Sequence, residues 1–480
     1  MWDVLLINSA HQVPFVGGYA LRINSRAVEN QTGAMVAGVV TLVFLFCFLV
    51  PTKHAQAQAW GIGGEYEVRQ DYRKNFALDT SNKDDLLRFE QELQLRWFYR
   101  YKDWLSVFLE AKVFGEHNVY NGGGARTSEV ELERGETWVR FDNLFGRDLS
   151  LKIGRQNFDE PRKWWWDDDL DAIGLRYRQN SWRFEFAVSQ EFVPVSLLDN
   201  IVEPENEGVT RVLARANWLY FWNHGLDLFF LYQDDRSATP PVGALVPANQ
   251  EDASDATLWW GGLRLSGNQI AGQYGELFYW ADFAGVLGNE ILLDLSDADD
   301  SKKTVTSRKK QRVRGWAIDV GGRWQSELFT RPAFILGYAR GSGDTNPDGT
   351  TDRAFRQTGL QSNDEEFRIY GEILRPELSN LQIPLVAVQF PLLSRSYVQF
   401  AYRRFRQLQA APFVRDGRIQ AEPNGINKDI GQEWMIYSLL KQWRDIEVEL
   451  VGAAFRAGNA YGPSSGKMAY SFFTQVTWEF

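Results

Sequence analysis

The chain has 480 residues, a formal net charge of −10 and a mean hydropathy of −0.36. It contains 32 Phe, 19 Trp and 18 Tyr, a large aromatic share, but only one Cys. The hydropathy argues against a bundle of transmembrane helices, and a single cysteine excludes an internal disulfide framework. The length fits one large domain or several small ones.

The first recognisable element is an apolar run at residues 35–50, followed by two overlapping A-x-A patterns that end at Ala57 and Ala59. We interpret residues 1–59 as a signal peptide with a long n-region. The run is shorter than the ~20 residues that a spanning helix needs, which disfavours an uncleaved membrane anchor without excluding it. Met35 is an alternative start.

Alternation of apolar and polar side chains dominates the rest of the chain. In residues 86–102 (LLRFEQELQLRWFYRYK), Leu93, Leu95 and Trp97 share one parity, whereas charged side chains fill most of the other. A strand of a soluble protein is usually ~5–6 residues long, but this alternation continues over more than twelve. The same period of two recurs in segments that begin at residues 104, 136, 182, 210, 225, 395 and 445, and in the terminal stretch 470–480.

The connections between these segments are alternately short and long. Short turns are predicted at 102–103, 179–181, 223–225, 267–268 and 444–445, and long polar loops at 73–84, 115–129, 157–170, 193–208, 234–255, 284–312, 342–383, 406–431 and 457–467. Nine long loops imply nine hairpins and therefore eighteen strands. Residues 366–374 also alternate, but a strand there would make nineteen, so we place them in the loop 342–383, with room to fold into the lumen.

This layout is typical of an outer-membrane β-barrel with short periplasmic turns and long extracellular loops. We therefore predict an all-β fold, a transmembrane antiparallel β-barrel of about 18 strands that spans residues 60–480. Lipid offers no hydrogen-bond partners, so every backbone N–H and C=O group must be paired within the protein. The last strand must therefore pair with the first, near residues 63–72. Phe480 would then lie at the periplasmic rim, and the barrel-assembly machinery is an expected partner.

Parity also places charged residues of both signs in the lumen, among them Arg96, Arg134, Glu136, Arg211 and Arg215. Any wet pore needs a polar wall, but paired arginines and carboxylates would in addition select charged or hydroxyl-rich solutes. No catalytic motif emerges, so we expect neither an enzyme nor a protein that binds nucleic acid.

Two loop motifs point to ligands only weakly. Asp344, Asn346 and Asp348 resemble the first half of a calcium loop, but Phe355 stands where the final acidic ligand belongs. A solvated turn is the simpler interpretation, and no cofactor is expected. The basic run 301–312 would touch lipopolysaccharide or an anionic polymer, with a solvated loop as the alternative. Outer-membrane lipid and lipopolysaccharide are expected partners in either case.

Several stretches together resemble one family, the alginate-export outer-membrane porins, over most of residues 60–480. They are LKIGRQNFDE with the following KWWWDD, GYARGSG, RQTGLQSN, GEILRPELSNLQ, KDIGQE and GNAYGPSSGKM. The resemblance implies an eighteen-stranded barrel of the bacterial outer membrane with an arginine-rich constriction. It also implies passive export of an anionic exopolysaccharide and a periplasmic scaffold that delivers it.

The resemblance extends to pore residues. Arg96, Glu136 and Asp167 match charged pore residues of the family, whereas Gly135 stands at the place of an arginine. Charged pore residues of the family are replaced at Asn157, Pro194, Leu198 and Glu449. Our candidate pore residues are Arg96, Arg134, Glu136, Arg155, Asp167, Arg211, Arg215 and Arg368. The alternatives to export are a general or sugar-uptake porin and a plugged structural or adhesive barrel.

Overall fold

The computed structural model describes most of the chain beyond the predicted signal peptide. The described ranges are 60–79, 85–121, 127–198, 202, 206–221, 223–236, 239–247, 254–270, 272–299, 302–346, 349–362 and 370–480. Residues 1–59 and Arg368 lie outside them.

Strands make up nearly all of the described secondary structure. They are β1 (Trp60–Lys74), β2 (Leu86–Tyr101), β3 (Leu105–Asn121), β4 (Ser128–Phe141), β5 (Leu149–Asp159), β6 (Asp167–Gln179), β7 (Trp182–Gln190), β8 (Thr210–Phe221), β9 (His224–Asp234), β10 (Leu245–Pro247), β11 (Ser254–Ile270), β12 (Glu276–Asp299), β13 (Lys302–Gln325), β14 (Ala333–Gly341), β15 (Thr351–Asp352), β16 (Leu381–Leu393), β17 (Ser396–Gln407), β18 (Asp429–Leu440), β19 (Ile446–Ala457) and β20 (Met468–Glu479). The described ranges also hold the short 3₁₀ helices η1 (Leu144–Gly146), η3 (Gly272–Tyr274) and η4 (Asn459–Ser464). Within the described part of the chain, no helix is long and apolar enough to cross a membrane.

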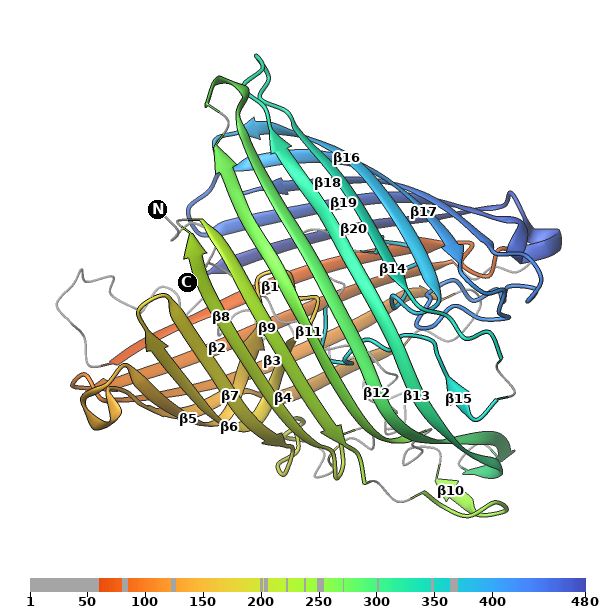
Figure 1. Cartoon of the computed structure of the whole chain (residues 1–480), viewed down its shortest axis with the longest axis horizontal. Coiled ribbons are helices and arrows are strands. Elements are labelled where there is room, and N and C mark those ends of the chain that lie inside the picture. Colours follow the sequence, from red (N-terminus) through yellow and green to blue (C-terminus); the bar gives the residue numbers. More distant parts are fainter. Residues whose placement is uncertain are drawn as a thin grey trace.

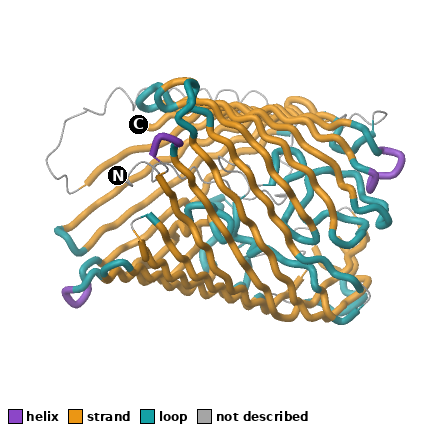
Figure 2. Tube along the Cα trace, turned by 45° about the horizontal axis from the view of Figure 1, so that its top comes forward, coloured by secondary structure: helices purple, strands orange, loops and turns teal. Residues whose placement is uncertain are grey.

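Of the 20 strands, 18 form a closed antiparallel barrel (Figures 1 and 2). Consecutive strands pair through hairpins, and the ring closes where β1 pairs with β20, from Glu65↔Glu479 to Lys74↔Tyr470. The short β10 and β15 instead pair with β13. The predicted fold class, the strand number and the pairing of the first and last strands are confirmed.

The alternation of side chains between two faces is clear in β20. Tyr470 and Phe472 are each 45% exposed on the outside, whereas Ser471 and Gln475 are 4% and 9% exposed on the luminal face. An apolar outside and a polar lumen are what a barrel in lipid requires. We call the end of the barrel with short connections the turn end and the opposite end the loop end. In outer-membrane barrels these face the periplasm and the exterior, respectively.

Two predicted connections are wrong. Residues 284–312 are not a loop, because β12 and β13 continue as a long hairpin in which Asp297 pairs with Lys303 and Asp294 with Ser307. In the backbone register an acidic strand lies opposite a basic one, so the polarity that resembles a loop belongs to two paired strands. The turn predicted at 267–268 falls inside β11, and the chain turns instead at η3.

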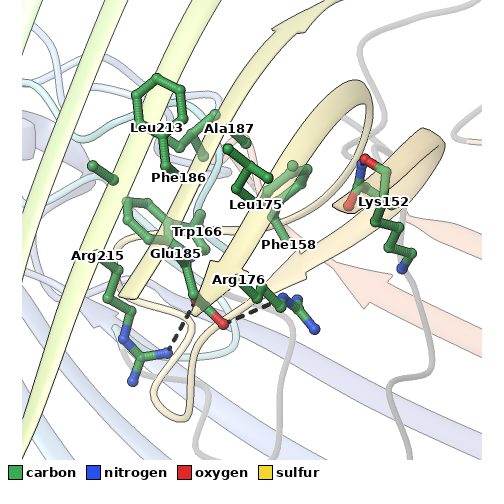
Figure 3. Close-up of a pocket in the computed structure, with 13 residues that line it drawn as sticks. Lys152, Phe158, Trp166, Leu175, Arg176, Glu185, Phe186, Ala187, Leu213 and Arg215 are labelled. Atoms are coloured by element: carbon green, nitrogen blue, oxygen red, sulfur yellow. Dashed lines mark hydrogen bonds and ion pairs between the residues drawn. The ribbon is translucent and has the colours of Figure 1, made fainter. Parts of the chain in front are cut away.

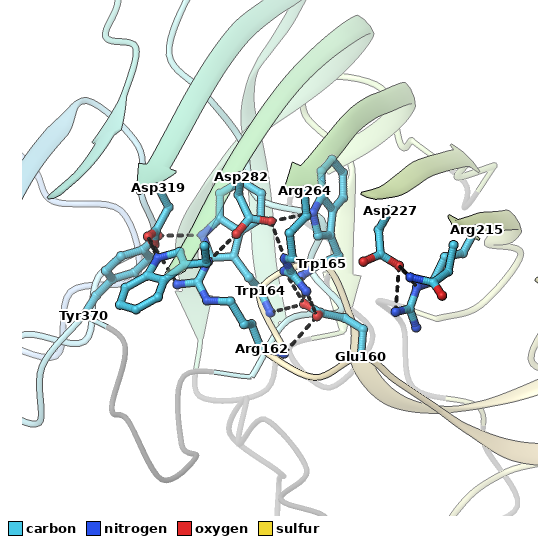
Figure 4. Close-up of polar contacts among 12 residues, drawn as sticks. Glu160, Arg162, Trp164, Trp165, Arg215, Asp227, Arg264, Asp282, Asp319 and Tyr370 are labelled. Carbon is cyan, nitrogen blue, oxygen red and sulfur yellow. Dashed lines mark hydrogen bonds and ion pairs between the residues drawn. The ribbon is translucent and has the colours of Figure 1, made fainter. Parts of the chain in front are cut away.

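One hairpin leaves the barrel wall. The pairing of β4 with β5 stops at Thr137↔Arg155, and the pairing of β6 with β7 stops at Ala172↔Ser189. The tip between these points, residues 156–171, contacts β11, β12 and β13 through charged side chains (Figure 4). The tip therefore folds into the lumen, and we call it the inserted hairpin.

A second segment takes the place of the inserted hairpin beside β4. The Arg134 N–H donates to the Val195 carbonyl at 2.8 Å, and the Leu197 N–H donates to the Leu132 carbonyl at 2.7 Å. This segment, 193–198, thus pairs with the edge that β4 would otherwise expose. Its apolar side chains Val193, Leu197 and Leu198 are more than half exposed.

The long connection between β14 and β16 also enters the lumen. No barrel strand lies in its described residues, and Tyr370, Ile373 and Leu374 are at most 1% exposed. The placement of residues 342–383 in one loop that enters the lumen is confirmed for the described residues between 342 and 380, whereas the predicted residues 381–383 begin β16. We call residues 342–380 the luminal loop.

Candidate channel constriction

The tip of the inserted hairpin is fixed by Glu160, which is 1% exposed. Its carboxylate accepts N–H bonds from the backbone of Arg162 (2.9 Å), Trp164 (2.6 Å) and Trp165 (2.9 Å). It also accepts two bonds from the Arg264 guanidinium of β11, one of them 3.0 Å long. Burial opposes ionisation, but the Arg264 charge and these bonds outweigh it and hold the pKa of Glu160 at about 2.

Arg162 connects the hairpin tip to the next two strands of the wall. Its guanidinium contacts Asp282 of β12 and lies 3.2 Å from Asp319 of β13 (Figure 4). Asp319 also accepts a 2.9 Å bond from the Tyr370 hydroxyl of the luminal loop. The Tyr370 oxygen in turn accepts the Trp164 indole N–H at 2.6 Å. Hairpin, wall and luminal loop therefore share one buried polar network.

Aromatic packing and backbone bonds complete this contact. Trp165 stacks on Phe229 of β9 with ring centroids 4.7 Å apart. The Thr358 hydroxyl donates to the Trp165 carbonyl, and the Asp167 N–H donates to the Leu360 carbonyl at 2.6 Å. The inserted hairpin and the luminal loop thus bind each other, and together they fill the lumen beside β9 and β11–β13.

The luminal loop has a second anchor on β18. Glu433 accepts the backbone N–H groups of Glu372, Ile373 and Leu374 at 2.6, 3.0 and 3.2 Å. Glu433 itself is fully buried, so these three donors take the place of water around its carboxylate. The loop is therefore held at two sites on different parts of the wall.

The other face of the inserted hairpin looks toward β3 and β4. Lys112 of β3 lies 3.7 Å from Asp169 on the hairpin and 3.9 Å from Glu110. Arg96 of β2 pairs with Glu110 at 2.8 Å and with Glu65 of β1 at 3.5 Å. Paired charges of both signs thus line this side of the lumen.

Arg155, the last residue of β5 that pairs with β4, differs from these paired cations. It is 7% exposed, and its Nε and Nη1 are buried without a hydrogen-bond acceptor among the described residues. Its charge acts on the carboxylates of Glu133 and Asp168, but neither accepts a bond from those two nitrogens. A buried guanidinium with two unpaired donors is a candidate anion site.

The structure corrects the parity of Arg134. Gly135 lies in a bulge opposite Glu110, so the luminal parity changes along β4. Arg134 consequently shares the face of Val130, which is 40% exposed, and not the luminal face of Glu136. It donates two bonds to Asp171 at 2.7 and 2.9 Å, which clamps the base of the inserted hairpin.

The remaining candidates lie in separate pairs. Glu136 contacts Lys152 at 3.2 Å, and Asp167 contacts Lys163 at 3.0 Å. Arg211 donates to Gln233 at 3.0 Å, and Arg215 contacts Asp227 at 2.8 Å. Arg368 is outside the described residues. The candidates therefore do not converge on a single ring.

A small cavity opens in the wall next to the hairpin (Figure 3). Glu185 of β7 lies in it between Arg176, at 3.4 Å, and Arg215, at 3.9 Å. Lys152 lines the same cavity. The cavity therefore presents three cations and one carboxylate.

The sequence interpretation missed Glu160, Arg162, Arg264 and Asp282. Arg264 and Asp282 sit at luminal positions of strands whose extent was misjudged, and Glu160 and Arg162 were assigned to an ordinary loop. The signal that could have found them is the charge density of RQNFDEPRKWWWDDD, unusual beside three tryptophans.

The calcium loop considered at Asp344, Asn346 and Asp348 receives no support from a ligand cluster. Within the described ranges, no three His, Cys, Asp or Glu side chains lie close enough to hold a metal ion. The Asp344 carboxylate accepts the Asn346 N–H at 3.3 Å, as in a turn, and Asp348 is outside the described residues.

Comparison with known proteins places the chain in a family. The sequence profile described as alginate export matches residues 59–474. This chain belongs to the alginate-export family. The alginate production protein AlgE of Pseudomonas aeruginosa is 25% identical over 420 residues, which cover 80% of this chain and 84% of that protein.

Solved structures with the same fold are outer-membrane proteins. Acinetobacter baumannii OccAB1 aligns with a TM-score of 0.53 at 12% identity and covers 87% of this chain and 97% of its own. Pseudomonas aeruginosa OccK5 aligns with a TM-score of 0.51 at 10% identity over 87% and 98%. These identities show the fold alone. Together with the family, they establish an outer-membrane channel protein.

Proposed function

We propose that this channel of the alginate-export family exports an anionic exopolysaccharide of the alginate type by diffusion. The observation that carries the proposal is Arg155, a buried guanidinium at the base of the inserted hairpin with two donor nitrogens that find no acceptor among the described residues. A guanidinium can bind a sugar carboxylate of the polymer through two parallel bonds. The relation to AlgE supports the same class of substrate.

The paired charges on β2 and β3 suit passage of a polymer better than its capture. Lys112 already has two carboxylates within 4 Å, and Arg96 has two as well. A polymer carboxylate would therefore exchange with a protein carboxylate at each step, and no single site would hold the chain tightly. Export under this proposal needs no energy source within the barrel.

The test is an Arg155→Gln variant in planar bilayers, with short oligomers of a uronic acid and neutral oligomers of equal length. We expect the uronate concentration that halves the ion current to rise about tenfold, the effect of losing one charge-assisted bond. Block by the neutral oligomer should not change. Arg178→Gln, at an exposed position of the turn end, is the matched control.

Equal block of the wild type by neutral and anionic oligomers would contradict the proposal. That result would instead favour the second candidate, a general or sugar-uptake porin, which the porin-like neighbours also fit. Unchanged uronate block in Arg155→Gln would exclude Arg155 as the anion site.

A further inference from the structure

The outer surface of the barrel carries basic residues at its loop end. β14, β17, β19 and β1 run toward the loops, and their last outward-facing residues are Arg340, Arg406, Arg456 and Lys74. Their outward direction follows from alternation, since the neighbouring Ala339, Phe405 and Phe455 are buried against the interior. We call these four residues, together with Arg404, the basic row.

The same strands are apolar at the turn end. Phe334 of β14, Ile446 of β19 and Ile62 of β1 are 40%, 39% and 54% exposed there. Within these strands the outward-facing cations therefore lie at the loop end, whereas Arg331 and Arg444 of the turn end belong to the turns before β14 and β19.

The strand register aligns the arginines of the basic row in two lines that run across the strands. Arg340 pairs with Gln382, which pairs with Arg406, and Arg404 pairs with Gln432, which pairs with Arg456. Two strand spacings separate the arginine backbones in each row, roughly 10 Å. Glutamine amides between them add uncharged donors.

These cations are poorly neutralised by the protein. Among the described residues, Arg406 and Arg456 make no side-chain ion pair or hydrogen bond. Arg340 lies over the Trp316 ring at 5.7 Å, and its Nε is buried without an acceptor. Asp429 of β18 lies beside the basic row, and its carboxylate is 3.4 Å from the Arg404 guanidinium.

We propose that the basic row binds the phosphates of lipid A, the bisphosphorylated glycolipid anchor of lipopolysaccharide. Guanidinium groups bind phosphate through two bonds, and a spacing of two strands lets one disaccharide headgroup meet two arginines. Trp316 and Trp434, both more than 40% exposed on the same outer surface, would pack on the upper acyl chains. This site lies outside the lumen and does not depend on the transported polymer.

The test compares the wild type with the triple variant Arg340→Gln, Arg406→Gln and Arg456→Gln. Purified, delipidated protein is titrated with lipid A, with enzymatically dephosphorylated lipid A and with phosphatidylglycerol, and bound lipid is counted by native mass spectrometry. We expect the triple variant to bind lipid A about a hundredfold more weakly, from the loss of three cation contacts. Dephosphorylated lipid A and phosphatidylglycerol should bind the wild type far less tightly than lipid A.

The control is Arg178→Gln, Arg331→Gln and Arg444→Gln, three exposed arginines at the turn end that remove the same charge. This variant should bind lipid A within about twofold of the wild type. Unchanged affinity in the first triple variant would overturn the proposal, as would equal binding of phosphatidylglycerol or dephosphorylated lipid A. If the triple variant does not fold, Arg406→Gln and Arg456→Gln singly should each weaken binding about fivefold. Single-channel conductance should be unchanged in every variant, which separates this site from the export pathway.

Discussion

At the scale of single residues, Glu160 holds the tip of the inserted hairpin. It replaces water around three backbone N–H groups and pairs with Arg264, which is 2% exposed. A buried ion pair adds little stability against an apolar alternative, but removing one partner leaves a buried charge uncompensated. The position of the inserted hairpin therefore depends on this carboxylate.

We predict that Glu160→Gln releases the hairpin tip from β11. Loss of one partner of a buried pair costs about 3–5 kcal/mol, more than a short tip is expected to withstand. Amide hydrogen exchange of residues 160–167 should become much faster, and single-channel conductance should rise as the lumen opens. Asp159→Asn, an exposed neighbour, is the control. Protection equal to that of the wild type in Glu160→Gln would show that the aromatic contacts alone hold the tip.

Residue-level prediction from sequence worked where the strands are regular and failed at one bulge. The alternation in residues 86–102 placed Arg96 on the luminal side, where it pairs with Glu65 and Glu110. The same rule failed for Arg134, since the bulge at Gly135 changes the luminal parity within β4. A single inserted residue leaves no mark in the polarity pattern, so only the pairing register shows the change.

At the scale of elements, the luminal loop contacts the connection between β17 and β18 through the buried carboxyl group of Glu377. Glu377 is 3.9 Å from Arg415, and its Oε2 is buried without a hydrogen-bond donor. Burial and the neighbouring Asp416 raise the pKa of Glu377 to about 7, despite Arg415. Protonation of this carboxyl therefore removes a buried charge that Arg415 compensates only in part.

The luminal loop should therefore pack more firmly in mild acid. The Glu377 carboxyl has a folded pKa near 7, above its ordinary value of 4.5, so the folded loop binds the proton more tightly than the released loop does. The destabilisation is absent below about pH 4.5, grows up to about pH 7 and is complete above it. Limited proteolysis between residues 349 and 362 should be slower at pH 5 than at pH 8. In the Glu377→Gln variant, proteolysis should be as slow at pH 8 as it is at pH 5. If the variant kept the pH dependence of the wild type, another group would be responsible for the effect.

The inserted hairpin shows why the strands could be predicted from the sequence, but not which of them leave the barrel wall. Residues around 151–159 and 167–179 form strands, but a period of two says only that a strand has two faces, not which neighbour it pairs with. The departure from the wall depends on Glu160, Arg264 and Asp282, which lie as much as 122 residues apart and meet only in the fold. The full length of β12 and β13 was missed for a related reason. Where a hairpin extends beyond the lipid, both of its faces can be polar, so the alternation that predicts a strand disappears.

At the scale of the whole molecule, the barrel depends on one seam, where β20 returns to β1. Gly64 and Phe480 exchange two backbone hydrogen bonds there, 2.9 and 3.0 Å long. A Cβ atom on Gly64 would lie 2.5 Å from the Gln94 carbonyl oxygen and 2.6 Å from the Phe480 ring. The seam therefore closes only if residue 64 has no side chain, whereas most other positions of β1 accept one.

We predict that Gly64→Val impairs closure of the barrel. The carbonyl of β2 cannot move without breaking the pairing of β1 with β2, so the strain would fall on the β1–β20 seam. The folded fraction, measured as the heat-modifiable band on a gel after refolding into lipid vesicles, should fall by more than half. Gly61→Val is the matched control, because nothing lies within 4 Å of a Cβ atom at that glycine of the same strand. If both variants close equally well, the seam tolerates displacement of Phe480, and closure must be driven by the ten-pair register of β1 with β20 as a whole.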